Sequence, residues 1–256
     1  MSERIPTNMR TLLILEELSR AGKPMTASEL GRAVGLAKQT VHRLCMTLEQ
    51  EGFLTRMAPS KRYVPTRRLR HMANGLLFAS NSQITAHQVL LDVAREVKET
   101  VNLVVPEESG MRYLDRIETD WAFRVQFPVG SNVPFHCTAS GKTYLASLAP
   151  RTRKSMVEGL DLPRLTERTH TTSTSLMSEL KQISSQGFAL DNEEFIEGMV
   201  AIAVPITDAD GRFAAALAFH GPRQRITPDG AINRLSPLLR GAKRISKALF
   251  ESMDVS

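Results

Sequence analysis

The sequence predicts an α+β protein built from two modules of different charge. Its first third carries three short amphipathic helical patterns and a hairpin pattern, and the rest alternates longer helical patterns with apolar strand patterns. Residues 1–75 hold 13 Lys and Arg against 6 Asp and Glu, whereas residues 76–256 hold 20 against 21. The whole excess of positive charge therefore lies in the first third, as expected for a polyanion-binding module joined to a nearly neutral one.

The length and composition exclude several classes of protein. A chain of 256 residues with 42% hydrophobic residues can bury the cores of two domains. Its longest apolar runs span only a few residues and Met1–Thr7 is polar, so we expect neither a membrane span nor a secretion signal. Cys45 and Cys137 cannot form a disulfide framework and match no metal motif. The sequence thus predicts a cytoplasmic protein without a metal or a cofactor.

The N-terminal helices are predicted by apolar spacing and by their end signals. An apolar stripe over residues 9–18 predicts the first helix. Thr26 and Glu29 form a capping box that begins the second, and Gly35 ends it. The third helix is predicted over residues 37–51, with apolar residues at i, i+3, i+4 and i+7 on one face. A short helix, a glycine turn and a longer helix form the pattern of a helix-turn-helix.

The exposed face of the third helix carries the predicted DNA contacts. Opposite its apolar face lie side chains that can bind phosphates and base edges, namely Lys38, Gln39, Thr40, His42 and Arg43. A hairpin follows over residues 53–65, with Lys61 and Arg62 as a basic tip that would contact phosphate or a minor groove. Such side chains can also form a merely solvated surface, but charge imbalance, helix spacing and hairpin together favour a winged helix-turn-helix over residues 1–66.

A linker and a second module follow. We expect a helical linker over residues 67–83, with a hinge at Asn81–Gln83. The elements expected beyond it are helices at 84–99, 139–148, after Pro150, 173–186 and 228–252, and strands at 100–106, 111–118, 122–129, 199–207 and 213–220. Helices flanking an antiparallel sheet make this module, residues 84–256, the α+β part of the protein.

A catalytic function of the second module is the alternative hypothesis. His136 and Cys137 stand beside a predicted helix start, and Asp191, Glu193 and Glu194 offer carboxylates, so a Cys137-dependent hydrolase can be drawn. Adjacent residues in an extended segment point to opposite faces, however, and the chain has no nucleophile elbow and no phosphate loop. A binding domain is therefore favoured over an enzyme. The Thr138–Gly141 turn fits either a carboxylate site at a helix N-terminus or a plain helix cap.

Several sequence blocks resemble a known family. Residues 35–44 and 47–53 resemble the winged helix of the IclR-type bacterial transcription regulators. Blocks of the second module stand in that family's order: Tyr113–Arg116, Val129–Ser131, Pro134–His136, Ser140–Lys142, Gly187–Ala189, Asp191–Glu194, Gly198, Ala203–Pro205, Asp210–Gly211 and Gly221–Pro222. The resemblance covers about residues 8 to 250.

The resemblance implies a GAF-like effector domain that also mediates oligomerisation and binds a small carboxylate metabolite. Its polar end would comprise Ala139, Ser140, Asp191, Ala201, Ala218 and His220, and the remaining wall would comprise Phe127, Val129 and Met199. Members that bind small 2-oxo acids carry hydroxyls or a thiol where this chain has Ala201, Ala218 and His220. This more apolar pocket is expected to prefer a larger acid, such as an aromatic carboxylate.

The sequence therefore predicts a DNA-binding transcriptional regulator and not an enzyme. Two winged helices of a homodimer would read a palindromic double-stranded operator, and family precedent implies that dimers can pair into tetramers. The carboxylate effector would modulate operator binding. An enzyme guided by a DNA-binding module, with a Cys137-dependent hydrolytic domain, is the alternative.

Overall fold

The computed structural model describes residues 5–77, 81–122 and 127–250. The chain divides into two compact units, residues 1–76 and residues 77–256. Each unit has a hydrophobic core of its own. No helix in the described ranges combines the length and the hydropathy that crossing a membrane requires.

The N-terminal unit is a small helical domain with a two-stranded hairpin. Its elements are α1 (Met9–Ala21), α2 (Ala27–Ala33), α3 (Lys38–Gln50), β1 (Leu54–Met57), β2 (Arg62–Pro65) and α4 (Arg67–Leu77). The core gathers the apolar stripes of α1, α2 and α3 around Tyr63 of β2. Strands β1 and β2 pair antiparallel. The unit therefore has the order and pairing of a winged helix-turn-helix.

Two local signals define the helix-turn-helix. The capping box at the start of α2 is confirmed, because the Glu29 amide donates to Thr26 Oγ1 at 3.2 Å and the Thr26 amide donates to Glu29 Oε2 at 2.7 Å. Gly35 has a φ of +67° in the turn between α2 and α3, which a residue with a side chain rarely adopts. A Cβ on Gly31 would lie 2.8 Å from the Leu36 carbonyl oxygen, so only glycine lets α2 approach this turn.

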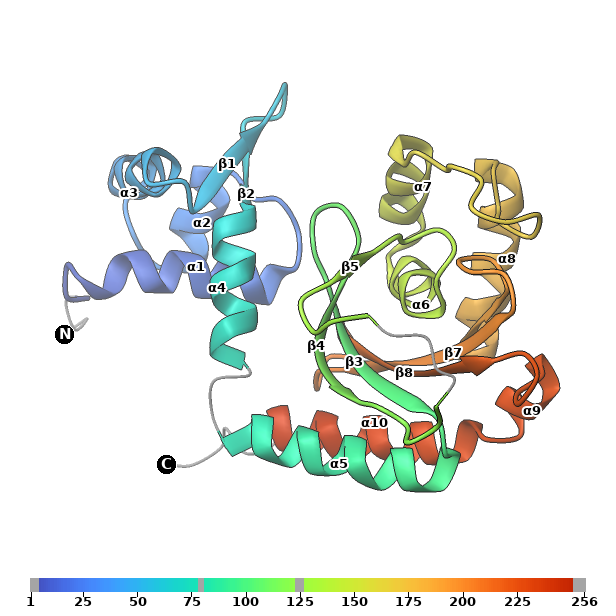
Figure 1. Ribbon diagram of the computed structural model, residues 1–256. Helices are drawn as coiled ribbons and strands as arrows, with labels where there is room; N and C mark the ends of the chain where they lie inside the picture. Colours follow the sequence, from blue (N-terminus) through green and yellow to red (C-terminus); the bar gives the residue numbers. More distant parts are fainter. Residues whose placement is uncertain (1–4, 78–80, 123–126, 251–256) are drawn as a thin grey trace. The chain divides into compact units, whose positions relative to one another are not determined.

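The C-terminal unit is a six-stranded antiparallel sheet with helices on both faces (Figure 1). Its elements along the chain are α5 (Asn81–Val97), β3 (Thr100–Pro106), β4 (Met111–Ile117), β5 (Asn132–Val133), α6 (Ala139–Ser147), α7 (Pro150–Gly159), α8 (Ser173–Gln186), β6 (Ala189–Asn192), β7 (Met199–Thr207), β8 (Phe213–Pro222), α9 (Pro228–Ile232) and α10 (Leu235–Phe250). Within the sheet the strands lie in the order β5-β4-β3-β8-β7-β6. Helices α5 and α10 cover one face, and α6 and α8 lie on the other. This architecture confirms the predicted α+β class.

The two faces of the sheet differ in side-chain size. Large residues of the central strands, such as Leu103, Ile202 and Phe219, face α5 and α10 and form the main core. On the opposite face, Ala201 and Ala218 pack with Ala139 of α6 in a separate cluster. Since small side chains fill less space between helix and sheet, this face can hold a cavity.

Most predicted elements are present, and β3 and α8 have the bounds that the sequence predicts. Asn81–Gln83, predicted as a hinge from their loop-like composition, form the first turn of α5, and the hinge itself stays a prediction. The predicted strand over 122–129 lies partly outside the described residues, and neither Ala122 nor residues 127–129 form a strand. Strands β5 and β6 have only two and four residues, which is too short for a clear alternation of apolar and polar residues.

The single C-terminal helix predicted over residues 228–252 is also wrong. The structure has α9 and α10 there, and residues 233–234 separate them. Pro237 lies in the first turn of α10, where its missing amide hydrogen costs nothing. In the interior of one long helix the same proline would remove a backbone hydrogen bond, so the chain begins a new helix before it.

Candidate functional site

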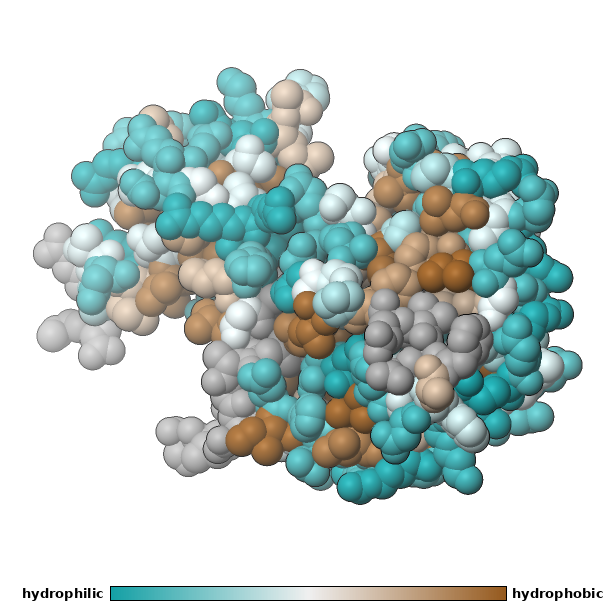
Figure 2. Space-filling view, in the orientation of Figure 1, coloured by the Kyte–Doolittle hydropathy of each residue, from teal (hydrophilic) through white to brown (hydrophobic). Residues whose placement is uncertain are grey.

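The predicted DNA-contacting residues of α3 lie on one exposed surface. Lys38, Gln39, His42 and Arg43 are exposed, and Thr40 is half-buried. The opposite side of α3 is held in the core by its apolar stripe. On the side shown in Figure 2, the surface over α3 is mostly hydrophilic. The helix thus presents a row of hydrogen-bond donors and acceptors from its N-terminal half, the part of a recognition helix that enters the major groove.

The two basic residues predicted for the wing are placed differently. Lys61 is exposed in the turn that joins β1 to β2. The Arg62 guanidinium instead points back to α2, donating to Glu29 Oε2 at 2.9 Å and to the Pro24 carbonyl oxygen at 2.9 Å. Arg62 therefore joins the hairpin to the capping box of α2. Of the two predicted wing residues, Lys61 is the one whose side chain is exposed to solvent.

A small cavity in the C-terminal unit lies between the alanine-lined face of the sheet and the start of α6. Its open volume is about 20 Å³, and it is lined by Asn102, Tyr113, Thr138, Ala139, Ser140, Asp191, Phe195, Met199, Ala201, Ala218, Phe219 and His220. All six residues predicted for the polar end of the effector pocket are among them, together with Met199. The sheet register explains this convergence, because Asp191 pairs with Ala201 and Ala201 with His220, so the three side chains lie in one row.

The polar end of the cavity is a buried network around His220. Asn102 Nδ2 lies 3.0 Å from His220 Nδ1, and Arg116 Nη2 lies 3.5 Å from His220 Nε2. The Arg116 side chain is 2% exposed, and its Nη1 donates to the Phe127 carbonyl oxygen at 2.5 Å. The Arg116 guanidinium, whose Nε also lies 3.6 Å from Glu118 Oε1, therefore stands behind the imidazole at this end of the cavity.

The remaining predicted wall residues differ in position. The Phe127 ring lies edge-on to the His220 ring, with 6.3 Å between the ring centroids, and stacks on the Phe195 ring at 5.5 Å. Phe127 therefore lies directly behind the residues that line the cavity. Val129 is 57% exposed and is not among the lining residues. The structure therefore brings Phe127 to the site and leaves Val129 outside it, because Val129 belongs to a turn that faces solvent before β5.

Asp191 is the buried acid of the cavity. It is fully buried, and its Oδ1 accepts hydrogen bonds from the amides of Glu194 at 2.8 Å and Phe195 at 3.3 Å. Its Oδ2 has no hydrogen-bond partner among the described residues. Burial, and then repulsion from Glu194, raise the pKa of Asp191 to about 8. The carboxyl can therefore offer the cavity a proton at neutral pH.

Several lining residues are not found by the sequence reasoning. Asn102 of the lining and Arg116 behind it contact His220, while Tyr113 and Phe195 complete the wall. Asn102 gives one usable signal, because it is an amide side chain within the apolar strand pattern Thr100–Pro106. A polar residue buried in a central strand needs a hydrogen-bond partner, which often marks a site.

The hydrolase hypothesis is not supported by the surroundings of Cys137. The thiol is fully buried, and burial is the main reason that its pKa is raised far above the usual value. His136 Nε2 lies 3.1 Å from the Pro163 carbonyl oxygen. Burial lowers the pKa of His136, although this contact favours the charged form. Cys137 is thus a small core residue and not an activated nucleophile.

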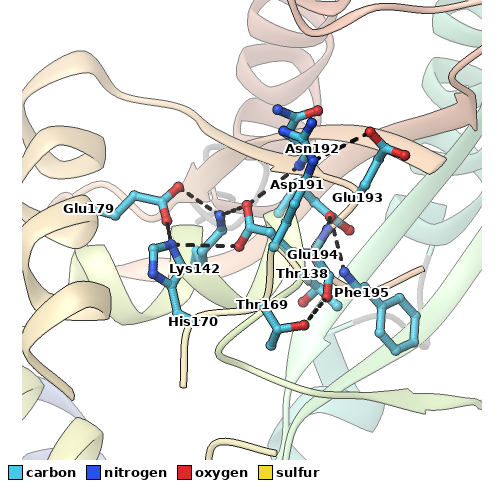
Figure 3. A network of polar contacts seen from close by, with 12 residues as sticks. Thr138, Lys142, Thr169, His170, Glu179, Asp191, Asn192, Glu193, Glu194 and Phe195 are labelled. Carbon is cyan, nitrogen blue, oxygen red and sulfur yellow. Dashed lines mark hydrogen bonds and ion pairs between the residues drawn. The ribbon is translucent and has the colours of Figure 1, made fainter. Parts of the chain in front are cut away.

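A buried lysine organises a second polar cluster beside the cavity (Figure 3). Lys142 of α6 is fully buried, and its Nζ donates to Glu179 Oε1 at 2.7 Å and to Glu194 Oε1 at 2.5 Å. Burial opposes the charged form of Lys142, but the two carboxylates outweigh it and raise its pKa. The pairing ties α6 to α8 and to the segment that follows Asp191.

Replacing Asp191 by asparagine is expected to change how stability depends on pH. The folded pKa of about 8 lies above the usual 3.8, so the stabilising contribution is fully present below pH 4 and is lost as the pH rises through 8. An asparagine side chain cannot ionise, so the Asp191→Asn variant should be more stable than the wild type at pH 9 by about 1–3 kcal/mol. Urea unfolding between pH 5 and 9 measures the difference. Asp161→Asn, at an exposed position, is the control, and parallel pH profiles of wild type and Asp191→Asn would contradict the prediction.

Comparisons with known proteins match both units. The description "IclR helix-turn-helix domain" matches residues 9–57, and "Bacterial transcriptional regulator IclR C-terminal" matches residues 79–247. A relative from Cupriavidus necator, "Probable transcriptional regulator SauR", is 34% identical over 243 residues, which cover 95% of this chain and 96% of that protein.

Solved structures agree with this assignment. The IclR protein of Thermotoga maritima is 28% identical, with a TM-score of 0.63 and coverage of 96% of this chain and 99% of that chain. A double mutant of the inducer-binding domain of PobR from Acinetobacter, solved with 3-hydroxybenzoic acid, is 26% identical with a TM-score of 0.59 and covers 63% of this chain and 95% of that chain. The chain therefore belongs to the IclR family of bacterial transcriptional regulators, with a DNA-binding helix-turn-helix domain and a ligand-binding C-terminal domain in place of an enzymatic one.

Proposed function

We propose that this protein binds a DNA operator through α3 and that a small carboxylate in the cavity of the C-terminal unit controls this binding. The observation that carries the proposal is the buried His220 network at the end of a cavity floored by alanines. A buried guanidinium and imidazole suit an anionic group. The first-turn amides of α6, at Ala139 and Ser140, have no partner within the helix and can add to the same end.

The other polar wall of the cavity favours an acid that also carries a hydroxyl group. Asp191 Oδ2 has no hydrogen-bond partner among the described residues, so a ligand hydroxyl there would satisfy a buried polar atom. Tyr113, Phe195 and Met199 line the wall between with apolar surface, which suits an aromatic ring. The structurally similar PobR domain, a double mutant solved with 3-hydroxybenzoic acid, provides a precedent for an aromatic hydroxy acid as ligand.

The size of the cavity supports control by two conformations. About 20 Å³ is room for roughly one water molecule, so a carboxylate metabolite must displace side chains to enter. A ligand that requires an expanded pocket binds the expanded arrangement better than the closed one, and it shifts the population accordingly. For DNA affinity to change, the two arrangements must present the winged helices differently.

We propose a homodimer as the DNA-binding form. Leu12 of α1 is 57% exposed, and Met72 and Leu76 of α4 are 42% and 68% exposed, so the N-terminal unit offers apolar surface on two helices for self-association. Two α3 helices related by a twofold axis would read a palindromic site, and dimers could pair through the C-terminal units into tetramers. Chromosomal DNA as the target implies the cytoplasm as the site of action.

The effector proposal is tested by a panel of aliphatic and aromatic acids, with and without hydroxyl groups, in thermal unfolding of the full chain. A ligand raises the melting temperature as its concentration exceeds Kd, and the same acid should change the affinity for operator DNA. In His220→Phe the ring volume is kept but the polar contacts are lost, so affinity for the acid should fall at least about 10-fold.

The matched control for this experiment is His87→Phe. His87 lies in α5, its side chain is 45% exposed, and it does not line the cavity. This variant should bind the acid like the wild type. If no acid shifts the melting temperature, or if His220→Phe binds as tightly as the wild type, the proposed effector site is refuted.

A further inference from the structure

The cluster around Lys142 presents a second set of side chains toward one point. Lys142 holds the Oε1 atoms of Glu179 and Glu194, so that the Oε2 atoms of both carboxylates face His170 (Figure 3). His170 Nε2 forms a hydrogen bond with Glu179 Oε2 and lies 3.9 Å from Glu194 Oε2. One donor atom from each of the three residues lies within 4.8 Å of the others. These atoms are close enough to surround a single ion.

A second observation that points to a ligand is the buried Oε2 atom of Glu194. Its side chain is 8% exposed, and no described residue donates a hydrogen bond to its Oε2. The 3.9 Å separation from His170 Nε2 is too long for a hydrogen bond. A buried carboxylate oxygen without a hydrogen-bond donor is costly, and Lys142 brings one positive charge to two carboxylates. A cation between Glu194 and His170 would satisfy both deficits.

We propose that His170, Glu179 and Glu194 form a binding site for a divalent transition-metal ion, with Zn²⁺ as the reference ion. One imidazole and two carboxylates are a donor set that Zn²⁺ accepts, and three protein ligands leave a position for water. The sequence gives no sign of this site, because its ligands come from the loop before α8, from α8 and from the segment after β6. Their spacing along the chain fits no metal motif.

Neighbouring residues hold the three ligands in position, as the outer shell of a metal site does. The second nitrogen of His170, Nδ1, forms a hydrogen bond with Ser175 Oγ, and such an outer partner fixes the ring orientation of a ligating histidine. Thr169, next to His170, donates to the Glu194 carbonyl oxygen at 2.7 Å, which ties the histidine loop to the glutamate segment. Lys142 fixes the two carboxylates in the same way, through its hydrogen bonds to Glu179 and Glu194. All three ligands are thus held in position by neighbours.

The site has an entry path and a route to the effector cavity. His170, Glu179 and Glu194 line an open groove of about 590 Å³, through which a hydrated ion can reach them. The Glu194 amide donates to Asp191 Oδ1, and Lys142 lies on the helix whose first turn borders the cavity. A bound ion would therefore brace two walls of the effector cavity, although the metal site itself stands independently of any effector.

The test uses the untagged full chain after removal of metals with EDTA. Isothermal titration with Zn²⁺ should give one equivalent bound per chain, and Co²⁺ should give visible absorption bands of a protein-bound ion. His170→Ala removes a ligand and should lower the Zn²⁺ affinity at least about 100-fold. Ser175→Ala removes only the outer hydrogen bond and should lower it about 10–100-fold. Glu179 and Glu194 are left intact, because replacing either would leave the buried charge of Lys142 unbalanced.

The matched control is His87→Ala. His87 Nδ1 lies 2.9 Å from Asp115 Oδ2, so this variant removes a histidine of the same unit that faces a single carboxylate. It should bind Zn²⁺ like the wild type. Far-UV circular dichroism of the metal-free variants checks that each is folded, and Ser175→Ala keeps the test decisive if His170→Ala does not fold. Absence of a stoichiometric site in the wild type, or wild-type affinity in both His170→Ala and Ser175→Ala, would overturn the proposal.

Discussion

Replacing Arg43 by alanine is expected to lower the affinity for a specific operator by about 100-fold or more while leaving the fold intact. Arg43 is exposed on α3, on the side opposite the buried Val41 and Cys45. A bidentate arginine contact to a guanine is worth about 1–3 kcal/mol, and a symmetric dimer would lose it in both half-sites. Because the side chain lies outside the core, the free energy of unfolding should change by less than about 0.5 kcal/mol.

The measurement is a binding titration with operator DNA and with unrelated DNA at one fixed salt concentration. Arg151→Ala is the matched control, because Arg151 is an exposed arginine of α7 and its loss removes the same charge from the C-terminal unit. The control should bind operator nearly as the wild type does. If Arg43→Ala keeps wild-type operator affinity, α3 does not carry the proposed base contacts.

Replacing Gly141 by alanine is expected to destabilise the C-terminal unit by about 3 kcal/mol or more. A Cβ at position 141 would lie 2.4 Å from the carbonyl oxygen and 2.5 Å from the Cα of Phe135. Both are backbone atoms of a buried residue, so the collision can be relieved only by moving α6 away from this segment. Moving α6 would also disturb Lys142 and the first turn that borders the cavity.

Gly159 provides the matched substitution. It ends α7, and a Cβ there would meet no heavy atom within 4 Å beyond its chain neighbours and the backbone of its own helix. Gly159→Ala should therefore be neutral or more stable by up to about 1 kcal/mol, the usual gain in helix propensity. Urea unfolding of both variants measures the two effects. Equal stability of Gly141→Ala and wild type would mean that α6 does not pack on Phe135 as closely as the structure has it.

The elements that the sequence predicts well are those with complete local signals. The second helix has a capping box at Thr26, α8 is closed by Gly187, and β3 is a sustained apolar run after α5. Each signal acts within a few residues, so it survives in any tertiary context. The elements predicted wrongly have weak or ambiguous local signals instead. The turn at Asn81–Gln83 is helical although its residues are typical of a loop, because Asn and Ser are also common at helix starts and so give an ambiguous local signal.

The candidate sites divide in the same way. The surface of α3 follows from helical periodicity, because residues opposite a buried stripe must face outward. The different placement of the two wing residues does not follow, since Arg62 is held against α2 by Glu29, which lies far from it in the sequence. In the cavity, the resemblance to the IclR family indicated Asp191 and His220. It did not indicate Asn102 or Arg116, which reach His220 only through the pairing of β3 with β8 and β4.

Composition, periodicity and helix-end signals are local properties, and they suffice to predict an α+β protein with a basic winged-helix module and a nearly neutral second module. The role of a regulator with an effector domain came from the resemblance to the IclR family. Long-range packing was needed to pair Arg62 with Glu29 of α2, to leave Val129 outside the cavity and to bring His170, Glu179 and Glu194 together beside Lys142. Such meetings depend on which strands pair and which helices cross. Strand pairing and helix packing are determined by the burial of whole apolar faces, so they cannot be predicted from any short stretch of sequence.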